Sequence, residues 1–368
     1  MIMTETRRID RHRIDPDHAL ALLRDTGLTG HGGGAFPTAI KIIEARGHHP
    51  DLIVNACDGE PLVQKDTALL RHRPMLVADG IAVLQRIVAP RRTLIAVHAD
   101  SPAEESAHQL IAAGRIRAAV LPVPDRYVSS EASSLASLAA NGEARPRYRE
   151  KPLAVKGLGR RGRPTLVLNA ETVARVAAAW LDQGPTPTRL VTVAGDLSRP
   201  GILEAPLSMT VGELVAGARP ASRPRAALVG GYGGRWFAWD EVEGRSLHDL
   251  GRELGAGLIM VDAEGCPVRT VGGILGYLAD QSAGQCGPCM FGLPAIAADW
   301  QLLLDRHHAT EAARRLRRRL PTIRGRGACH HPDGAVTMAA SALEVFADHI
   351  AAHRQGRCER TSVLAGRS

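Results

Sequence analysis

Aromatic residues are scarce in this chain. Phe, Trp and Tyr together make up 3% of the 368 residues, so the cores must be built from Ala, Leu and Val. Proteins that stack nucleic-acid bases interleave aromatic side chains with basic ones, and this sequence has no such arrangement. The scarcity therefore argues against a nucleic-acid-binding platform, although the formal net charge is +8.

Cysteine and long apolar runs are scarce as well. Six cysteines are too few for a secreted disulfide framework, and the C-x-x-C spacing of two of them favours metal or redox chemistry in a reducing cell. No apolar run reaches the roughly 18 residues that a membrane span needs. The first residues, Met1 to Arg8, lack the apolar core of a signal peptide. We therefore expect a cytoplasmic protein with no direct membrane span.

The hydrophobic patterns predict three successive regions. Strands and helices alternate up to about residue 185, which predicts an α/β domain with a mostly parallel sheet over residues 1–185. Short strands and turns then predict a small β-grasp-like domain over residues 186–265, with strands at 190–195, 201–205, 211–216, 227–234 and 258–261. Strands are absent after that, and four helices predict a bundle over residues 266–358, at about 268–280, 290–305, 309–320 and 333–353.

A dense run of glycines lies near the N-terminus, between Gly30 and Gly34. Backbone without Cβ atoms can close around a phosphate or a flat cofactor. Pro37 and Thr38 predict the start of a helix directly after the run, and a helix N-terminus binds anions. A tight turn that packs a helix against a strand would use the same glycines.

Polar side chains follow the strand predicted at 51–56. Asn55, Asp58 and Glu60 share one loop at its carboxyl end, where open α/β sheets bind their ligands. They could contact ribityl or ribose hydroxyls, and simple turn chemistry would also explain them. Cys57 and His31 are interpreted as residues that line this region rather than as metal ligands.

Three cysteines are predicted to converge at one end of the helical region. Cys286 and Cys289 share one turn, a spacing used by zinc sites, iron–sulfur clusters and dithiol redox centres. Cys329 adds a third soft thiolate, which favours an iron–sulfur cluster over zinc. Cys266 and Cys358 lie a helix length away, roughly 20–30 Å at 1.5 Å per residue. We expect neither of these two to reach the cluster, and both to lie near each other at the far end of the helices.

Arginines become denser just before Cys329. Only four of the 46 basic residues are lysines, and the run from Arg314 to Arg326 is the densest part of an otherwise scattered distribution. This run suits docking of an acidic electron carrier beside the thiolates. A solvated helix face in an arginine-rich protein explains it equally well.

These motifs together resemble the flavin-containing, NADH-binding subunit of bacterial respiratory complex I and its relatives in NAD-linked hydrogenases and formate dehydrogenases. The resemblance covers nearly the whole chain. It rests on four segments before the cysteines, namely Gly30 to Lys41, Asn55 to Pro61, Tyr127 to Ala132 and Pro164 to Thr172, and on Ser282 to Cys289. It implies a Rossmann-like FMN-binding domain, a β-grasp domain of the soluble-ligand-binding type and a helical iron–sulfur domain, in the order predicted above.

The resemblance also implies roles for individual residues. The FMN and nucleotide pocket would be lined by Gly30, Gly32, Gly33, Gly34, Phe36, Lys41, Asn55, Asp58, Asn169 and Thr172. Glu60 and Glu131 would hold the nicotinamide end of NADH, where hydride transfer requires no general acid or base. The cluster, a 4Fe-4S or a 3Fe-4S centre, would be bound by Cys286, Cys289 and Cys329.

Two departures from the family motifs affect these roles. Ala283 replaces the first cluster cysteine, so the fourth ligand would be His330, His331, water or a partner, unless the cluster has three irons; we favour His330. A histidine ligand would raise the reduction potential of the cluster. Of the phenylalanines that hold adenine in the family only Phe36 is present, and fewer stacking partners weaken adenine binding.

The sequence thus predicts an oxidoreductase subunit that passes electrons from NADH through FMN to the cluster, and on to a ferredoxin-like protein or a membrane reductase subunit. The alternative is a non-catalytic relay or scaffold subunit that keeps the cluster without turning over NADH. The missing phenylalanines support that alternative. Two further departures from the family motifs also support it: Cys57 and Asp58 replace two acids, and the Tyr127 to Ala132 segment keeps only one glutamate. A zinc-stabilised binding protein is a third interpretation.

Overall fold

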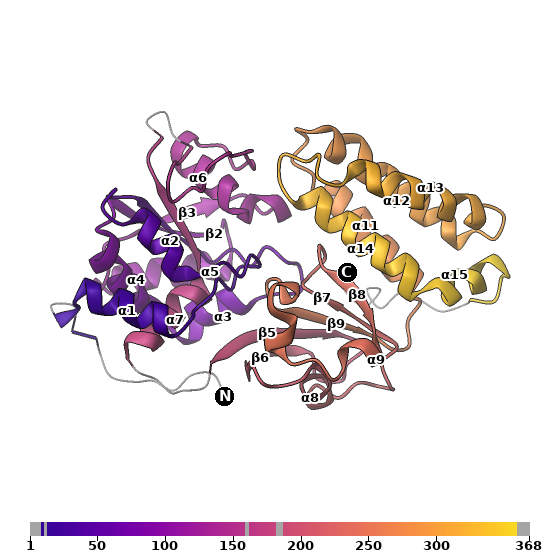
Figure 1. The fold of residues 1–368 in the computed structure, drawn as a ribbon, viewed down its shortest axis with the longest axis horizontal. Coiled ribbons are helices and arrows are strands. Elements are labelled where there is room, and N and C mark those ends of the chain that lie inside the picture. The colour runs from indigo at the N-terminus through magenta and orange to yellow at the C-terminus, as the bar shows by residue number, and fades with distance from the viewer. Residues whose placement is uncertain (1–8, 11–12, 159–161, 182–186, 359–368) are drawn as a thin grey trace. The chain divides into compact units, whose positions relative to one another are not determined.

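The computed structural model describes residues 9–10, 13–158, 162–181 and 187–358, and the chain forms two compact units, residues 1–190 and 191–368 (Figure 1). The domain boundary predicted at residue 185 lies outside the described residues.

A four-stranded parallel sheet forms the centre of the first unit. Its strand order is β3-β2-β1-β4, with bounds Ala119–Val123, Arg92–His98, Asp51–Asn55 and Thr165–Asn169. Leu52, Ile53 and Val54 of the inner strand β1 are all 0% exposed, because helices cover both faces of a parallel sheet. The prediction of an α/β fold with a parallel sheet is confirmed.

The register of this sheet places two polar residues side by side. β1 and β4 pair so that Asn55 lies opposite Asn169, at the carboxyl ends of both strands. The helices of the unit are α1 to α7, at Pro16–Asp25, Thr38–Ala45, Lys65–His72, Pro74–Val88, Pro102–Ala112, Ala132–Asn141 and Ala170–Trp180. Helices α3, α6 and α7 each begin after the carboxyl end of a strand, namely β1, β3 and β4.

A mixed five-stranded sheet begins the second unit. Its order is β6-β5-β9-β7-β8, with bounds Gly201–Pro206, Thr188–Gly195, Leu258–Asp262, Ala226–Val229 and Arg235–Ala238. β5 pairs with β9 in parallel, whereas β7 pairs antiparallel with both β9 and β8.

Of the strands predicted in this unit, one is a helix and another ends earlier than predicted. The segment 211–216 is helix α8 (Val211–Gly217), because Thr210 and Glu213 form a capping box and Val211, Leu214 and Val215 form one buried helical face. The strand predicted at 227–234 ends at Val229, since Gly230 and Gly231 adopt left-handed φ angles of 98° and 93° that begin a turn.

Helices make up the rest of the second unit, as predicted from about residue 268 onward. After the short helices α9 (Trp239–Val242) and α10 (Leu247–Leu250) and strand β9, the long ones are α11 to α15, at Pro267–Asp280, Leu293–Gln301, Ala309–Ile323, His331–Val345 and Ala347–Arg354. Helices α11 to α14 pack side by side (Figure 1).

The single helix predicted over 333–353 is wrong, because α14 and α15 meet at a bend of 72°. Phe346 leaves helical geometry at the break and packs edge-on against Trp236 of β8, with ring centroids 4.9 Å apart. No single helix of the described residues is long and apolar enough to cross a bilayer; α14 and α15 have the length and composition only as this bent pair.

Candidate cofactor sites

The glycine loop leaves a run of backbone amides without partners. Gly30 donates its amide to the Phe36 carbonyl over 2.9 Å, and His31 donates its amide to Thr172 Oγ1 over 2.9 Å. From Gly32 to Phe36 the amides donate no hydrogen bond to any described part of the chain. Helix α2 begins directly afterwards, and its N-cap residue Pro37 provides no side-chain cap. Free amides ahead of an uncapped helix fit a phosphate group.

A buried network of charged side chains contacts this loop through His31. The Glu171 carboxylate lies 3.1 Å from His31 Nδ1 and 3.0 Å from Lys65 Nζ, and accepts the Leu190 amide over 2.7 Å. Lys65 Nζ also donates to Asp66 and to Asn169, each over 2.9 Å. Lys65 and Glu171 are both 1% exposed, so each charge depends on the other for its stabilisation.

The protonation states of this network follow from burial and charge. Burial by itself would raise the pKa of the Glu171 carboxyl, but His31, Lys65 and Arg175 hold it well below its usual range. Burial would lower the pKa of Lys65, but Asp66 and Glu171 raise it above its usual value. Burial lowers the pKa of His31 more than Glu171 raises it. The network thus holds a charged Lys65–Glu171 pair beside the buried His31 imidazole.

The loop after β1 packs closely on the loop before α6. A Cβ on Gly59 would lie 2.1 Å from Ser130 Oγ and 3.1 Å from Ser130 Cβ, so a larger residue here would require the Ser130 side chain to move. Asn55 Nδ2 donates to the Ser130 carbonyl over 2.9 Å, and Tyr127 donates its hydroxyl to Glu60 over 2.6 Å. The structure therefore brings Asn55 and Glu60 together with the segment that contains Glu131.

Two of the acids expected in the pocket also cap helices. Asp58 accepts the backbone amides of Asp66 and Thr67 at the start of α3, over 2.8 and 2.7 Å. Glu131 is the N-cap of α6 and accepts the Ser133 and Ser134 amides, with Arg149 Nη1 3.3 Å away. These contacts fix the backbone of both loops.

Burial and the neighbouring Asp66 carboxylate raise the pKa of Asp58 to about 7. The folded protein holds this proton up to about pH 7, whereas the unfolded chain releases it near the ordinary value of 3.8. The folded state binds more protons between these values, so this group's contribution to the unfolding free energy falls as the pH rises from about 4 to 7. In Asp58→Asn we expect this part of the pH dependence to disappear.

Urea denaturation of both proteins at several pH values between 4 and 8 measures that difference. The matched control is Asp100→Asn, because Asp100 is exposed and, like Asp58, has a left-handed φ angle (58° against 46°). It should keep the wild-type dependence. An unchanged wild-type slope in Asp58→Asn would contradict the assignment.

The three cysteines expected to hold a cluster lie on two loops, and two of them affect the ionisation of the third, Cys289. Cys286 and Cys289 lie on the turn before α12, where Pro288–Gly292 forms one π-helical turn, and Cys329 lies just before α14. Burial, together with Cys286 and Cys329, raises the pKa of Cys289 to about 12, and the hydroxyl of Ser282 opposes this. Three soft thiols close enough for two of them to affect the third fit an iron–sulfur cluster, whose iron ions bind thiolates.

His330 and the arginine run lie near these thiols in sequence, and they differ in exposure and in their ion pairs. The His330 side chain is 99% exposed, and its Nδ1 lies 3.6 Å from Asp333. In the arginine run, Arg315 and Arg319 pair with the buried Asp299 of α12, over 2.8 and 3.0 Å. Five other arginines of the run are exposed, namely Arg314, which pairs with Glu311, and Arg317, Arg318, Arg324 and Arg326.

Some residues of the first site were missed by sequence reasoning. Lys65 and Asp66 follow the Asn55 motif by a few residues, but nothing local indicates that they reach Asn169. Glu171 could have been identified from the sequence, because it lies inside the Asn169 to Thr172 motif. Tyr127 likewise begins the Tyr127 to Ala132 motif, and only the fold shows that it contacts Glu60.

Comparison with known families identifies both cofactor regions. Residues 23–178 match the Nuo51 FMN-binding domain, and residues 270–353 match the iron–sulfur binding region of NADH-ubiquinone oxidoreductase F, a 4Fe-4S family. These matches confirm the predicted cofactor classes, FMN and an iron–sulfur cluster. They include the glycine loop and the three cysteines.

Similar proteins cover most of the chain. The NADH-quinone oxidoreductase F 2 subunit of Rhizobium meliloti is 27% identical over 93% of this chain and 90% of its own length. The NADH-quinone oxidoreductase F subunit of Streptomyces coelicolor is 27% identical over 93% and 84%. A crystal structure of an NAD⁺-reducing [NiFe]-hydrogenase in the H₂-reduced state superposes with a TM-score of 0.82 at 28% identity. It covers 93% of this chain, which spans only 63% of that hydrogenase chain.

Proposed function

Since this chain is a homologue of the F subunit of NADH-quinone oxidoreductases and of an NAD⁺-reducing hydrogenase, we propose that it passes electrons from NADH through FMN to an iron–sulfur cluster and on to a protein acceptor. It is an oxidoreductase of the NADH dehydrogenase type, with an FMN-binding and a 4Fe-4S-binding region. The observation that carries the proposal is the glycine loop, whose unpartnered amides precede an uncapped helix inside the FMN-binding region.

We infer three functional regions along the chain. Residues 1–185 would form the FMN and nucleotide domain, and the parallel sheet supports this. Residues 186–265 would form a β-grasp domain, supported by the mixed sheet with α8 packed on its core. Residues 266–358 would form the iron–sulfur domain, supported by the side-by-side helices α11 to α14.

The first unit supplies the residues that would hold FMN. The free amides from Gly32 to Phe36 would bind its phosphate, and the backbone of Gly30, Gly32, Gly33 and Gly34 would line it. Lys41, Asn55, Asp58, Asn169 and Thr172 lie on the same loops or on elements bonded to them. FMN, when bound, allows a two-electron donor to be coupled to one-electron acceptors. The protein's task is to hold the ring and keep the charges around it fixed.

Glu60 and Glu131 are our candidates for the nicotinamide end. Tyr127 orients Glu60 by a hydrogen bond, and Arg149 lies beside Glu131. Hydride transfer needs no general acid or base from the protein, so both carboxylates would act by orienting the substrate. NADH would give up a hydride, which carries both electrons, and leave as NAD⁺.

The second unit supplies the cluster ligands. Cys286, Cys289 and Cys329 would bind three irons, and His330 is our candidate for the fourth, because it adjoins Cys329 and is exposed. The exposed arginines between Arg317 and Arg326 would attract an acidic protein acceptor, either ferredoxin-like or a subunit of a membrane reductase. A cytoplasmic location is consistent with both kinds of acceptor.

Addition of NADH to anaerobically purified protein tests this function. We expect protein that contains flavin, iron and sulfide, and rapid bleaching of the flavin absorbance when NADH is added. Bound flavin and cluster whose colours do not change with NADH would reject NADH turnover and support the relay subunit instead. A colourless protein that contains zinc would overturn the proposal as a whole.

A further inference from the structure

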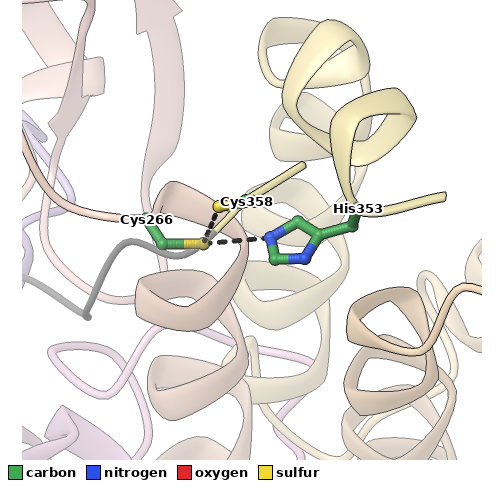
Figure 2. A group of neighbouring side chains, drawn as sticks. All are labelled: Cys266, His353 and Cys358. Carbon is green, nitrogen blue, oxygen red and sulfur yellow. Dashed lines mark hydrogen bonds between the residues drawn. The ribbon is translucent and has the colours of Figure 1, made fainter. Parts of the chain in front are cut away.

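A second cysteine group lies apart in sequence from the cluster residues. Cys266 precedes α11, His353 lies near the end of α15 and Cys358 follows that helix (Figure 2). Cys266 Sγ lies 3.1 Å from His353 Nε2 and 3.7 Å from Cys358 Sγ. Cys266 is 0% and His353 4% exposed. The prediction that Cys266 and Cys358 lie near each other is confirmed.

We propose that Cys266, His353 and Cys358 bind a Zn²⁺ ion. The three ligand atoms lie within 4.8 Å of one another, and no other such group of potential ligands is found in the part of the chain that the structure describes. The thiols of Cys286, Cys289 and Cys329 therefore do not form so compact a group. The compact group of Cys266, His353 and Cys358 therefore suits a single ion, whereas the wider group of three thiols suits a cluster.

The distances agree with tetrahedral zinc coordination. Zn–S bonds of about 2.3 Å and Zn–N bonds of about 2.0 Å at tetrahedral angles place two sulfurs about 3.8 Å apart, and a sulfur and a nitrogen about 3.5 Å apart. The observed separations are 3.7 Å for the two sulfurs and 3.1 Å for Cys266 Sγ and His353 Nε2. A shift of a few tenths of an ångström in the imidazole would admit the ion.

The donor set also suits zinc. Two thiolates and one imidazole nitrogen are ordinary zinc ligands, and His353 turns Nε2 toward Cys266 in Figure 2. No fourth protein ligand joins the group among the described residues, which leaves one position for water.

The site would tie the two ends of the helical region together. Cys266 and Cys358 are 92 positions apart, and helices α11 to α15 all lie between them. An ion that binds only the folded arrangement stabilises it by mass action. The zinc would thus hold the end of α15 against the start of α11. The proposed cluster ligands Cys286 and Cys329 would lie toward the opposite end of α11.

A disulfide between Cys266 and Cys358 is the competing explanation. Their sulfurs are 3.7 Å apart, farther than the roughly 2.05 Å of a disulfide bond, and both thiols are free in the structure. A disulfide would also leave His353 without a role. The two explanations differ in metal content and in the mass of the intact chain.

Zinc and iron analysis of the full-length protein with its cluster intact tests the proposal. We expect zinc in stoichiometric amount, with a zinc-edge X-ray absorption spectrum that shows sulfur and nitrogen ligands without interference from iron. Cys358→Ser and His353→Gln should each lose the zinc and keep the iron. Cys286→Ser should lose iron and keep the zinc, and Cys57→Ser, which removes a buried thiol elsewhere, should keep both.

This pattern distinguishes a failure of the zinc proposal from a failure of the proposed electron transfer, because each variant is expected to lose one metal and keep the other. Protein that takes up no zinc overturns the proposal, as does zinc retained at full occupancy in Cys358→Ser. A wild-type chain whose mass shows a Cys266–Cys358 disulfide, in protein prepared anaerobically, also overturns it.

Discussion

Cys286→Ser is expected to abolish the iron–sulfur cluster and to leave the flavin bound. Only three cysteines converge near this position, so the loss of one leaves two thiolates for a centre that needs about four ligands. A serine hydroxyl is a much poorer ligand for iron than a thiolate. Iron, sulfide and flavin analysis of anaerobically purified protein measures the outcome. The expected result is almost complete loss of iron and sulfide with wild-type flavin content.

Cys57→Ser is the matched control for this substitution. Cys57 is also buried, at 2% exposed, but it lies in the first unit and outside the cysteine group. It should keep the cluster. A Cys286→Ser protein with its full iron and sulfide would show that the cluster has other ligands.

The same preparations address the fourth ligand. If His330 binds iron, His330→Ala should lower the iron content and lower the reduction potential of what remains, because nitrogen donors raise cluster potentials. Ala283→Cys, which restores the cysteine of the family motif, should then rescue the cluster in His330→Ala. Unchanged iron content and potential in His330→Ala would assign the fourth position to another ligand.

Lys65→Met is expected to cause the largest loss of stability in the first unit. Lys65 is 1% exposed and lies 3.0 Å from Glu171 and 2.9 Å from Asp66, so its removal leaves two buried carboxylates without their main cation. Breaking a buried ion pair from one side costs about 3–5 kcal/mol. Lys65 also bonds Asn169 Oδ1 at the end of β4, so the flavin should be released as well.

Urea denaturation followed by flavin fluorescence measures both effects. The matched control is Lys151→Met, an exposed lysine, which should change the unfolding free energy by less than about 0.5 kcal/mol. A second variant, Glu171→Gln, should resemble Lys65→Met, because it removes one of the two carboxylates that pair with the Lys65 ammonium. Wild-type stability and flavin content in Lys65→Met would show that the network does not support the site.

Local signals explain what the sequence could determine. The alternation of buried strands and helices predicted the parallel sheet, because both periodicities are properties of single segments. The glycine loop and the Cys286-x-x-Cys289 turn are also local, since each needs only a few consecutive residues to form. At 211–216 we predicted a strand, although Thr210 and Glu213 already had the spacing of a capping box.

Contacts between distant residues were decided only by the tertiary structure. Nothing near Phe346 in sequence predicts the bend between α14 and α15, because the bend depends on packing against Trp236, a residue of another element. Lys65 and Glu171 become an ion pair only when helices α3 and α7 meet in a region that excludes water. Cys266, His353 and Cys358 likewise form the proposed zinc site only because helices α11 to α15 bring the two ends of this region together. Periodicity and caps act within one segment, whereas burial and charge pairing depend on which segments the fold brings together.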